Sequence, residues 1–157
     1  HQGVSDSRLR RRSNRQLIPG TALSTVEIEI PSKTAYVGVV RLALASLARA
    51  AGLDEETVDD MKIAVGEACA NAVLANEEAG VGASVSVHWD LEPERIVIEV
   101  GDRGAGPGQE DEQEDTLGVA SRAVMSMALL DQLVDECELL PRPEGGTTAR
   151  LVVFTPR

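Results

Sequence analysis

The sequence predicts an α+β protein, a two-layer sandwich in which helices cover one face of a mixed β-sheet. Short stretches rich in valine and isoleucine alternate apolar with polar residues, as half-buried strands do. Three longer stretches repeat apolar residues at helical spacing. The predicted order is strand, two helices, two strands, helix, two strands. Strands grouped in this way are typical of α+β proteins rather than of strictly alternating α/β proteins.

A basic arm precedes the folded part of the chain. Residues 1–23 lack apolar periodicity and are expected to be a disordered arm, followed by a single domain at 24–157. The formal net charge is −11, but the first 15 residues hold five arginines against one aspartate. The arm therefore carries about +4 and the rest about −15. Nucleic acid is an unlikely partner, because so acidic a surface repels phosphates.

The first strand and helix have clear signals. Residues 26–30 alternate apolar with acidic side chains, which predicts a half-buried strand. Ser32 or Thr34 is placed to cap a helix that runs to about Ala51, where Gly52 ends it.

The later elements follow the same rules. Asp54 is placed to cap a second helix that reaches about Ala79. Further on, the patterns predict strands at 84–91 and 95–101, a loop at 102–116, a helix from Leu117 to about Leu133, and strands at 136–140 and 147–155.

Composition favours a reducing cytoplasm. No apolar run approaches the roughly 20 residues that span a bilayer, and no signal peptide opens the sequence. Cys69 and Cys137 are isolated, so neither a disulfide framework nor a zinc site is indicated.

The second helix carries the first chemical signal. One side forms a core stripe, and the other side, which is usually charged, is also apolar, so we expect this helix to be covered on both sides or to line a cavity. The stripe consists of Val58, Met61, Val65, Cys69 and Ala72, and the other side carries Ile63, Ala64, Ala70 and Leu74.

Within this apolar stretch, Glu67 and Asn71 are polar and lie four residues apart, on one helix face. A buried carboxylate without partners costs several kcal/mol, on the order expected for a desolvated charge. Either an arginine and a backbone amide satisfy the pair, or a ligand does. The two explanations are equally good for the pair alone.

Two loops add to the pattern. Residues 101–106 read G-D-R-G-A-G after a strand, and alternate glycines let a ligand approach the backbone closely. Alone this is an acidic turn more often than a site, and it matches neither a Walker A loop nor a Rossmann fingerprint. Residues 145–148 read G-G-T-T. They either form a simple hairpin turn or place two threonine hydroxyls at the mouth of a pocket.

Taken in order, E-x-x-x-N on a helix, D-x-G-x-G after a strand and G-T-T before the last strand resemble the ATP site of the Bergerat fold in the GHKL superfamily. The segments 31–42 and 61–73 are similar to the anti-sigma-factor serine kinases of that superfamily. The resemblance is dense over residues 25–106 and returns at 145–153.

The resemblance implies a set of roles. Asn71 would coordinate Mg²⁺, and Glu67 would act as the base that orients or deprotonates the attacking serine. Asp102 would bind the adenine amino group of ATP, with Gly104 and Gly106 shaping the pocket and Thr147 near the adenine. Arg41 would contact partner proteins.

The same resemblance implies the partners. They would be an alternative sigma factor and a STAS-type anti-anti-sigma protein, in a stress-response partner switch with a homodimeric kinase. The alternative is a sigma-binding module that keeps the fold but has lost turnover.

The chain departs from the family at the lid. A glycine-rich G-x-G normally wraps the phosphates, and that position falls here near residues 124–126, Val-Met-Ser. The segment 110–115 carries five acids and no base. Of the glycine-rich pattern only Leu117-Gly118 remains, several residues earlier in the chain. A helix that begins there would offer its N-terminal backbone amides to phosphate.

Overall fold

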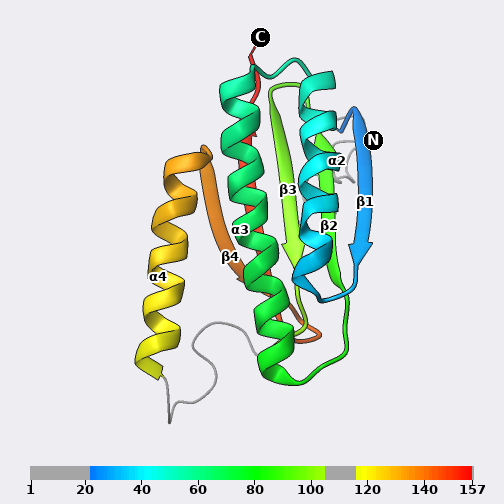
Figure 1. The fold of residues 1–157 in the computed structure, drawn as a ribbon. Coiled ribbons are helices and arrows are strands. Elements are labelled where there is room, and N and C mark those ends of the chain that lie inside the picture. Colours follow the sequence, from blue (N-terminus) through cyan, green and yellow to red (C-terminus); the bar gives the residue numbers. More distant parts are fainter. Residues whose placement is uncertain (1–21, 105–115, 157) are drawn as a thin grey trace, which may run out of the picture.

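The computed structural model describes residues 22–104 and 116–156, with the side chains of residues 116–123 outside the description. Three helices lie on one face of a five-stranded sheet (Figure 1). None of the helices in the described ranges combines the length and apolarity needed to cross a membrane. The elements are β1 (Ser24–Ile30), η2 (Thr34–Tyr36), α2 (Val37–Ala50), α3 (Glu55–Ala79), β2 (Val85–Leu91), β3 (Arg95–Gly101), α4 (Thr116–Leu133), β4 (Glu136–Pro141) and β5 (Thr147–Phe154).

The sheet has the order β1-β2-β3-β5-β4, and every neighbouring pair is antiparallel. The two-layer α+β architecture is confirmed, but the expectation of a mixed sheet was wrong. Two helices between β1 and β2 bring the chain back to the end where β1 stops, so β2 runs opposite to β1. A single helix, α4, connects β3 to β4 and returns the chain to the end where β3 starts, so β4 runs in the same direction as β3. Because β5 inserts between them, no parallel pair forms.

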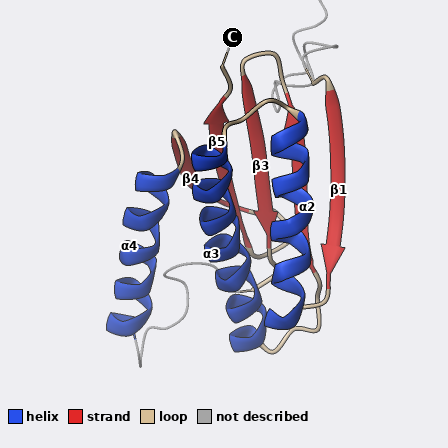
Figure 2. Ribbon diagram, turned by 45° about the horizontal axis from the view of Figure 1, so that its top comes forward, coloured by secondary structure: helices blue, strands red, loops and turns tan. Residues whose placement is uncertain are grey.

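The core lies between the sheet and the pair α2 and α3 (Figure 2). Alternate strand residues face the helices, including Trp89 of β2, which is 1% exposed. With so few aromatics, the packing depends on aliphatic side chains. The largest fully buried ones besides Trp89 are Leu44, Met61, Ile96, Ile98, Leu130 and Leu151.

The opposite face of the sheet carries a row of ionisable side chains. Glu27, His88, Glu99, Arg150 and Glu138 occupy facing positions on the five strands in turn. Arg150 Nε lies 3.6 Å from an oxygen of Glu99, and Nη1 lies 3.4 Å from an oxygen of Glu138. Opposite charges on facing positions favour this strand register.

Helix boundaries match the expectations in part. Asp54 caps α3 as predicted, and its carboxylate accepts a 2.9 Å hydrogen bond from the first-turn backbone. The predicted cap of the first helix was wrong. A 3-10 turn, Thr34–Tyr36, precedes α2, whose N-cap residue makes no side-chain capping bond. The Ser32 hydroxyl is engaged elsewhere, because it donates to the carbonyl of Ala83 at 2.6 Å.

Candidate functional site

Helix α3 is buried on its sheet side and open on part of its outer side. All five residues of the predicted core stripe are 0–3% exposed. On the other side Ala64 is buried and Leu74 is half-buried. Ile63, however, is 52% exposed, and Ala70 is exposed as well. The first alternative, that α3 is covered on both sides, was therefore wrong, because α2 and α4 flank the helix and leave part of its outer side exposed. The second alternative, that α3 lines a cavity, stays a prediction.

Glu67 and Asn71 lie together on this helix. The Asn71 Nδ2 atom is 3.4 Å from Glu67 Oε2 and 2.6 Å from the hydroxyl of Ser126 on α4. Glu67 is half-buried and Asn71 is exposed, so the expected burial of the pair was wrong. Among the described residues no arginine pairs with Glu67, and no group donates to the Asn71 amide oxygen. The pair thus has oxygen atoms available for a ligand.

Asp102 lies where β3 ends and is 7% exposed. Its Oδ1 atom accepts hydrogen bonds from the backbone amides of Gly104 at 2.9 Å and Thr147 at 3.2 Å. Burial raises the pKa of the Asp102 carboxyl, and these two hydrogen bonds oppose the shift. Within the described part of the chain Oδ2 accepts no hydrogen bond. A free oxygen on this largely buried carboxylate favours a ligand that donates a hydrogen bond.

Thr147 begins β5 beside Asp102, and its backbone oxygen accepts from the amide of Asp102 at 2.9 Å. The Thr147 hydroxyl is buried and has no hydrogen-bond partner among the described residues. Such an orphaned group costs about 1–3 kcal/mol, so it normally indicates an absent water or ligand. The Asp102 carboxylate and the Thr147 hydroxyl, which both have hydrogen-bonding capacity left unused, therefore lie close together where the glycine loop adjoins β5.

Two glycines bring the loop this close to its neighbours. A Cβ atom at Gly104 would lie 2.5 Å from the carbonyl oxygen of Ala75, so the loop touches the backbone of α3. Gly146 has φ +102°, and a Cβ there would overlap the carbonyl oxygen of Asp102. The predicted role of Gly104 in shaping the site is thus consistent with direct contact between loop and helix.

Sequence reasoning missed Asn76, which is 0% exposed and follows Asn71 by five residues. Its oxygen accepts from the backbone amide of Arg103 at 2.8 Å, and its Nδ2 donates to the Ser32 hydroxyl at 2.7 Å. Nδ2 also lies within reach of two carbonyl oxygens of residues 83 and 84. Asn76 therefore fastens the residue after Asp102 to α3. An asparagine near a helix end is typical of a capping residue, so its position in the sequence carries little sign of this role.

The remaining predicted residues are dispersed. Arg41 is exposed on α2, and its side chain crosses to α3, where Nη1 lies 3.0 Å from the position of a Cβ on Gly66. Gly118 is in the first turn of α4. Gly106, the acidic segment 110–115 and the basic arm up to residue 21 lie outside the described residues. The structure thus groups Glu67 with Asn71 on α3, and it groups Asp102 with Gly104 and Thr147 at the loop that contacts the later part of α3.

Comparison with known proteins agrees with this geometry. Residues 30–153 match the family model of the histidine kinase-like ATPase domain. Serine-protein kinase RsbW of Bacillus licheniformis is 31% identical over 87% of this chain and 89% of its own length. The Bacillus pumilus protein of the same name is 32% identical over 84% and 86%.

Solved structures share the fold. The RsbU and RsbW domains of a Mycobacterium tuberculosis protein match with a TM-score of 0.60 at 23% identity, over 85% of this chain and 33% of that one. The SiaB-SiaC complex from Pseudomonas aeruginosa gives a TM-score of 0.59 at 13% identity, over 90% and 95%. At these identities the likeness concerns the fold alone. The family match and the long alignments to its relatives place this chain in the histidine kinase-like ATPase domain family, among the RsbW serine-protein kinases.

Proposed function

We propose that this chain is an anti-sigma factor that binds ATP with Mg²⁺, sequesters an alternative sigma factor and phosphorylates a serine of a STAS-type anti-anti-sigma protein. The observation that carries the proposal is the pair of buried polar groups at the glycine loop. The unused oxygen of Asp102 fits the exocyclic amino group of adenine, which is a donor. The orphaned hydroxyl of Thr147 supplies a second polar contact beside it.

The phosphate end of the nucleotide would extend along α3. Mg²⁺ prefers oxygen ligands and is usually held by one or two protein groups together with phosphates. The amide oxygen of Asn71 fits this preference, and among the described residues no group of three or more acidic, histidine or cysteine side chains is arranged to hold a metal ion. When bound, the ion would neutralise charge on the transferring phosphoryl group. Asn71 is thus suited to be the single protein ligand.

Glu67 is suited to the base. It lies one helical turn before Asn71 and is half-buried, so it can hold the hydroxyl of an incoming serine. The serine oxygen forms a bond to the γ-phosphorus, the bond to the bridging oxygen of ADP breaks, and the serine proton passes to the Glu67 carboxylate. Most of the catalytic effect in such transfers comes from positioning and electrostatic stabilisation.

Helix α2 supports the proposal that Arg41 contacts the protein partners. It contains no acidic residue, although the domain is strongly acidic. Three described cationic side chains form neither an ion pair nor a hydrogen bond with another described residue. They are Lys33, Arg41 and Lys62. We call the outer surface of α2 and α3, with these cations and the exposed apolar side chains of the two helices and of η2, the α2–α3 surface. Its apolar members are Tyr36 (41% exposed), Val39 (54%), Leu42 (70%) and Ile63 (52%).

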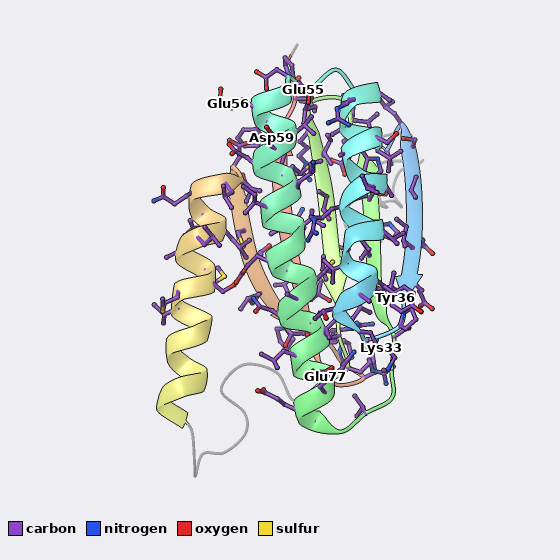
Figure 3. All side chains as sticks on the ribbon, viewed as in Figure 1. Lys33, Tyr36, Glu55, Glu56, Asp59 and Glu77 are labelled. Atoms are coloured by element: carbon purple, nitrogen blue, oxygen red, sulfur yellow. The ribbon has the colours of Figure 1, made fainter. Side chains whose placement is uncertain are left out.

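Acidic side chains lie at both ends of the helix pair. Glu55, Glu56 and Asp59 gather at one end, and Glu77 lies at the other end, which also carries Lys33 and Tyr36 (Figure 3). A partner segment with apolar and acidic side chains would complement the basic, apolar part. The α2–α3 surface is thus the one we assign to the sigma factor and the STAS protein.

We also propose that the chain acts in the cytoplasm as a homodimer in a stress response. Both cysteines are free thiols, in keeping with a reducing compartment. Burial raises the pKa of the Cys69 thiol to about 12, so it remains protonated and inert there. The homodimer rests on the family resemblance, and sedimentation of the purified chain tests it.

Transfer of labelled γ-phosphate to a STAS protein from the same genome tests the catalytic proposal. Wild type should label a single serine, and Glu67→Gln should reduce the rate by at least about 100-fold, the scale of general-base catalysis. If Glu67→Gln transfers as fast as wild type, the assigned base is wrong. Sigma binding without any transfer by wild type would select the alternative, a binding module without turnover.

A further inference from the structure

One side chain of α4 reaches the predicted metal ligand. Ser126 Oγ accepts a 2.6 Å hydrogen bond from Asn71 Nδ2, and it is the one hydrogen bond between described side chains of α3 and α4. Ser126 is 9% exposed, whereas Val124 and Met125 beside it are 68% and 69% exposed. The serine thus faces α3 while its neighbours face solvent.

This hydrogen bond and the contact to Glu67 together fix how the Asn71 amide is turned, because the carboxylate only accepts and Ser126 Oγ accepts here. A carboxamide has a donor NH₂ group and an acceptor oxygen, and only the oxygen binds a cation. Nδ2 is directed to Ser126 Oγ and, at a longer 3.4 Å, to Glu67 Oε2. Both neighbours act as acceptors, so the amide oxygen must point away from them. It accepts nothing from the described residues and remains open to a ligand.

We propose that Ser126 is a positioning residue, which holds the Asn71 amide so that its oxygen faces the Mg²⁺ of the bound nucleotide. The inference rests on the proposed function, because it takes Asn71 as the metal ligand. Without the serine hydroxyl, the longer contact to Glu67 is the remaining restraint, and the amide can rotate to present NH₂ to the ion. Groups that orient a metal ligand typically change metal affinity by about 10–100-fold when they are removed.

Magnesium dependence of nucleotide binding tests this directly. A non-hydrolysable ATP analogue is titrated with MgCl₂, and the thermal shift of the full chain is measured together with equilibrium binding of the analogue. Ser126→Ala should raise the Mg²⁺ concentration that gives half of the maximal thermal shift by at least about 10-fold, which is the scale expected when a group that orients a metal ligand is lost. Binding of the analogue without Mg²⁺ should stay unchanged. Ser126→Thr, which keeps the hydroxyl, should remain within about two-fold of wild type.

Two further variants separate positioning from general damage. Ser46→Ala makes the same change at an exposed position of α2 and should leave the magnesium dependence as in wild type. In an Asn71→Ala background, Ser126→Ala should have no additional effect, because the group it orients is gone. A purely structural role of Ser126 would instead give additive losses.

The outcomes separate this inference from the proposed function. If wild type shows no magnesium-dependent nucleotide binding, the proposed function fails, and the role of Ser126 fails with it. If wild type binds and Ser126→Ala binds equally well, only the positioning role is overturned. Tighter binding by Ser126→Ala would also overturn it, since the hydrogen bond would then hold Asn71 away from the ion.

Discussion

At the scale of single residues, the state of Asp102 makes a prediction about pH. Burial raises its folded-state pKa, so the folded chain retains this proton more readily than the unfolded chain does. Below the ordinary carboxyl pKa of about 4, both states are protonated and no difference arises. As pH rises through the folded pKa, ionisation of Asp102 lowers the free energy of unfolding. Asp102→Asn should therefore be more stable than wild type at pH 7, and the advantage should shrink toward pH 4 in urea titrations followed by Trp89 fluorescence.

The same variant should lose nucleotide. The carboxamide introduced by Asp102→Asn would still offer an oxygen to the Gly104 and Thr147 amides, but it would turn an NH₂ group toward the adenine amino group, which is also a donor. Wild type with Mg-ATP at about 100 times its Kd should gain about 2.7 kcal/mol of stability. Asp102→Asn should gain almost nothing in the same thermal-shift experiment. An undiminished shift would show that adenine is bound elsewhere.

Asn76 supports a second residue-scale prediction. Truncation to alanine leaves the part-buried amide of Arg103 without its acceptor and removes one of the two hydrogen bonds of the Ser32 hydroxyl. An orphaned polar group costs about 1–3 kcal/mol, so Asn76→Ala should lower the free energy of unfolding by about 2 kcal/mol. Asn71→Ala is the control, because Asn71 is exposed and its loss should cost less than about 1 kcal/mol. Equal losses for the two would mean that Asn76 is not the fastening residue.

At the scale of elements, one glycine within α3 and one in the loop that contacts α3 should respond oppositely to alanine. Gly66 lies inside α3, and a Cβ there meets only the flexible Arg41 side chain, so Gly66→Ala should stabilise by up to about 1 kcal/mol through helix propensity. Gly104→Ala would drive a Cβ into the backbone of α3 at Ala75 and should destabilise by at least about 2 kcal/mol. Urea denaturation of both variants checks the sign. A stabilising Gly104→Ala would mean that loop and helix are not in contact.

The elements themselves were largely predictable, because each depends on local signals. Alternation located the strands, helical spacing located the core stripe of α3, and Asp54 marked its start. The position of β5 between β3 and β4 was not predictable, since strand order depends on long-range packing that leaves no local pattern.

The candidate site divides in the same way. Motif spacing identified Glu67, Asn71 and Asp102 as candidates, but it did not predict their environments. The pair on α3 is more open than its apolar neighbours suggest, because whether a helix face is covered depends on where other helices lie. The roles of Asn76 and Ser126 arise from contacts 27 and 55 residues away along the chain, which no periodicity encodes.

At the scale of the whole molecule, the uneven distribution of charge predicts how partners bind. The chain is acidic overall, yet the α2–α3 surface holds exposed Leu42 together with Arg41 and Lys62, which form no ion pair with another described residue. Association with a sigma factor or STAS protein from the same genome should therefore be steered by charge and weaken as salt rises. Arg41→Glu should slow association by at least about 10-fold and flatten the salt dependence. Arg49→Glu is the matched control on α2, because it makes the same charge change at a residue that already pairs with Glu55 at 2.8 Å. Surface plasmon resonance at low and high salt measures both, and equal effects of the two variants would show that partners dock on a different face.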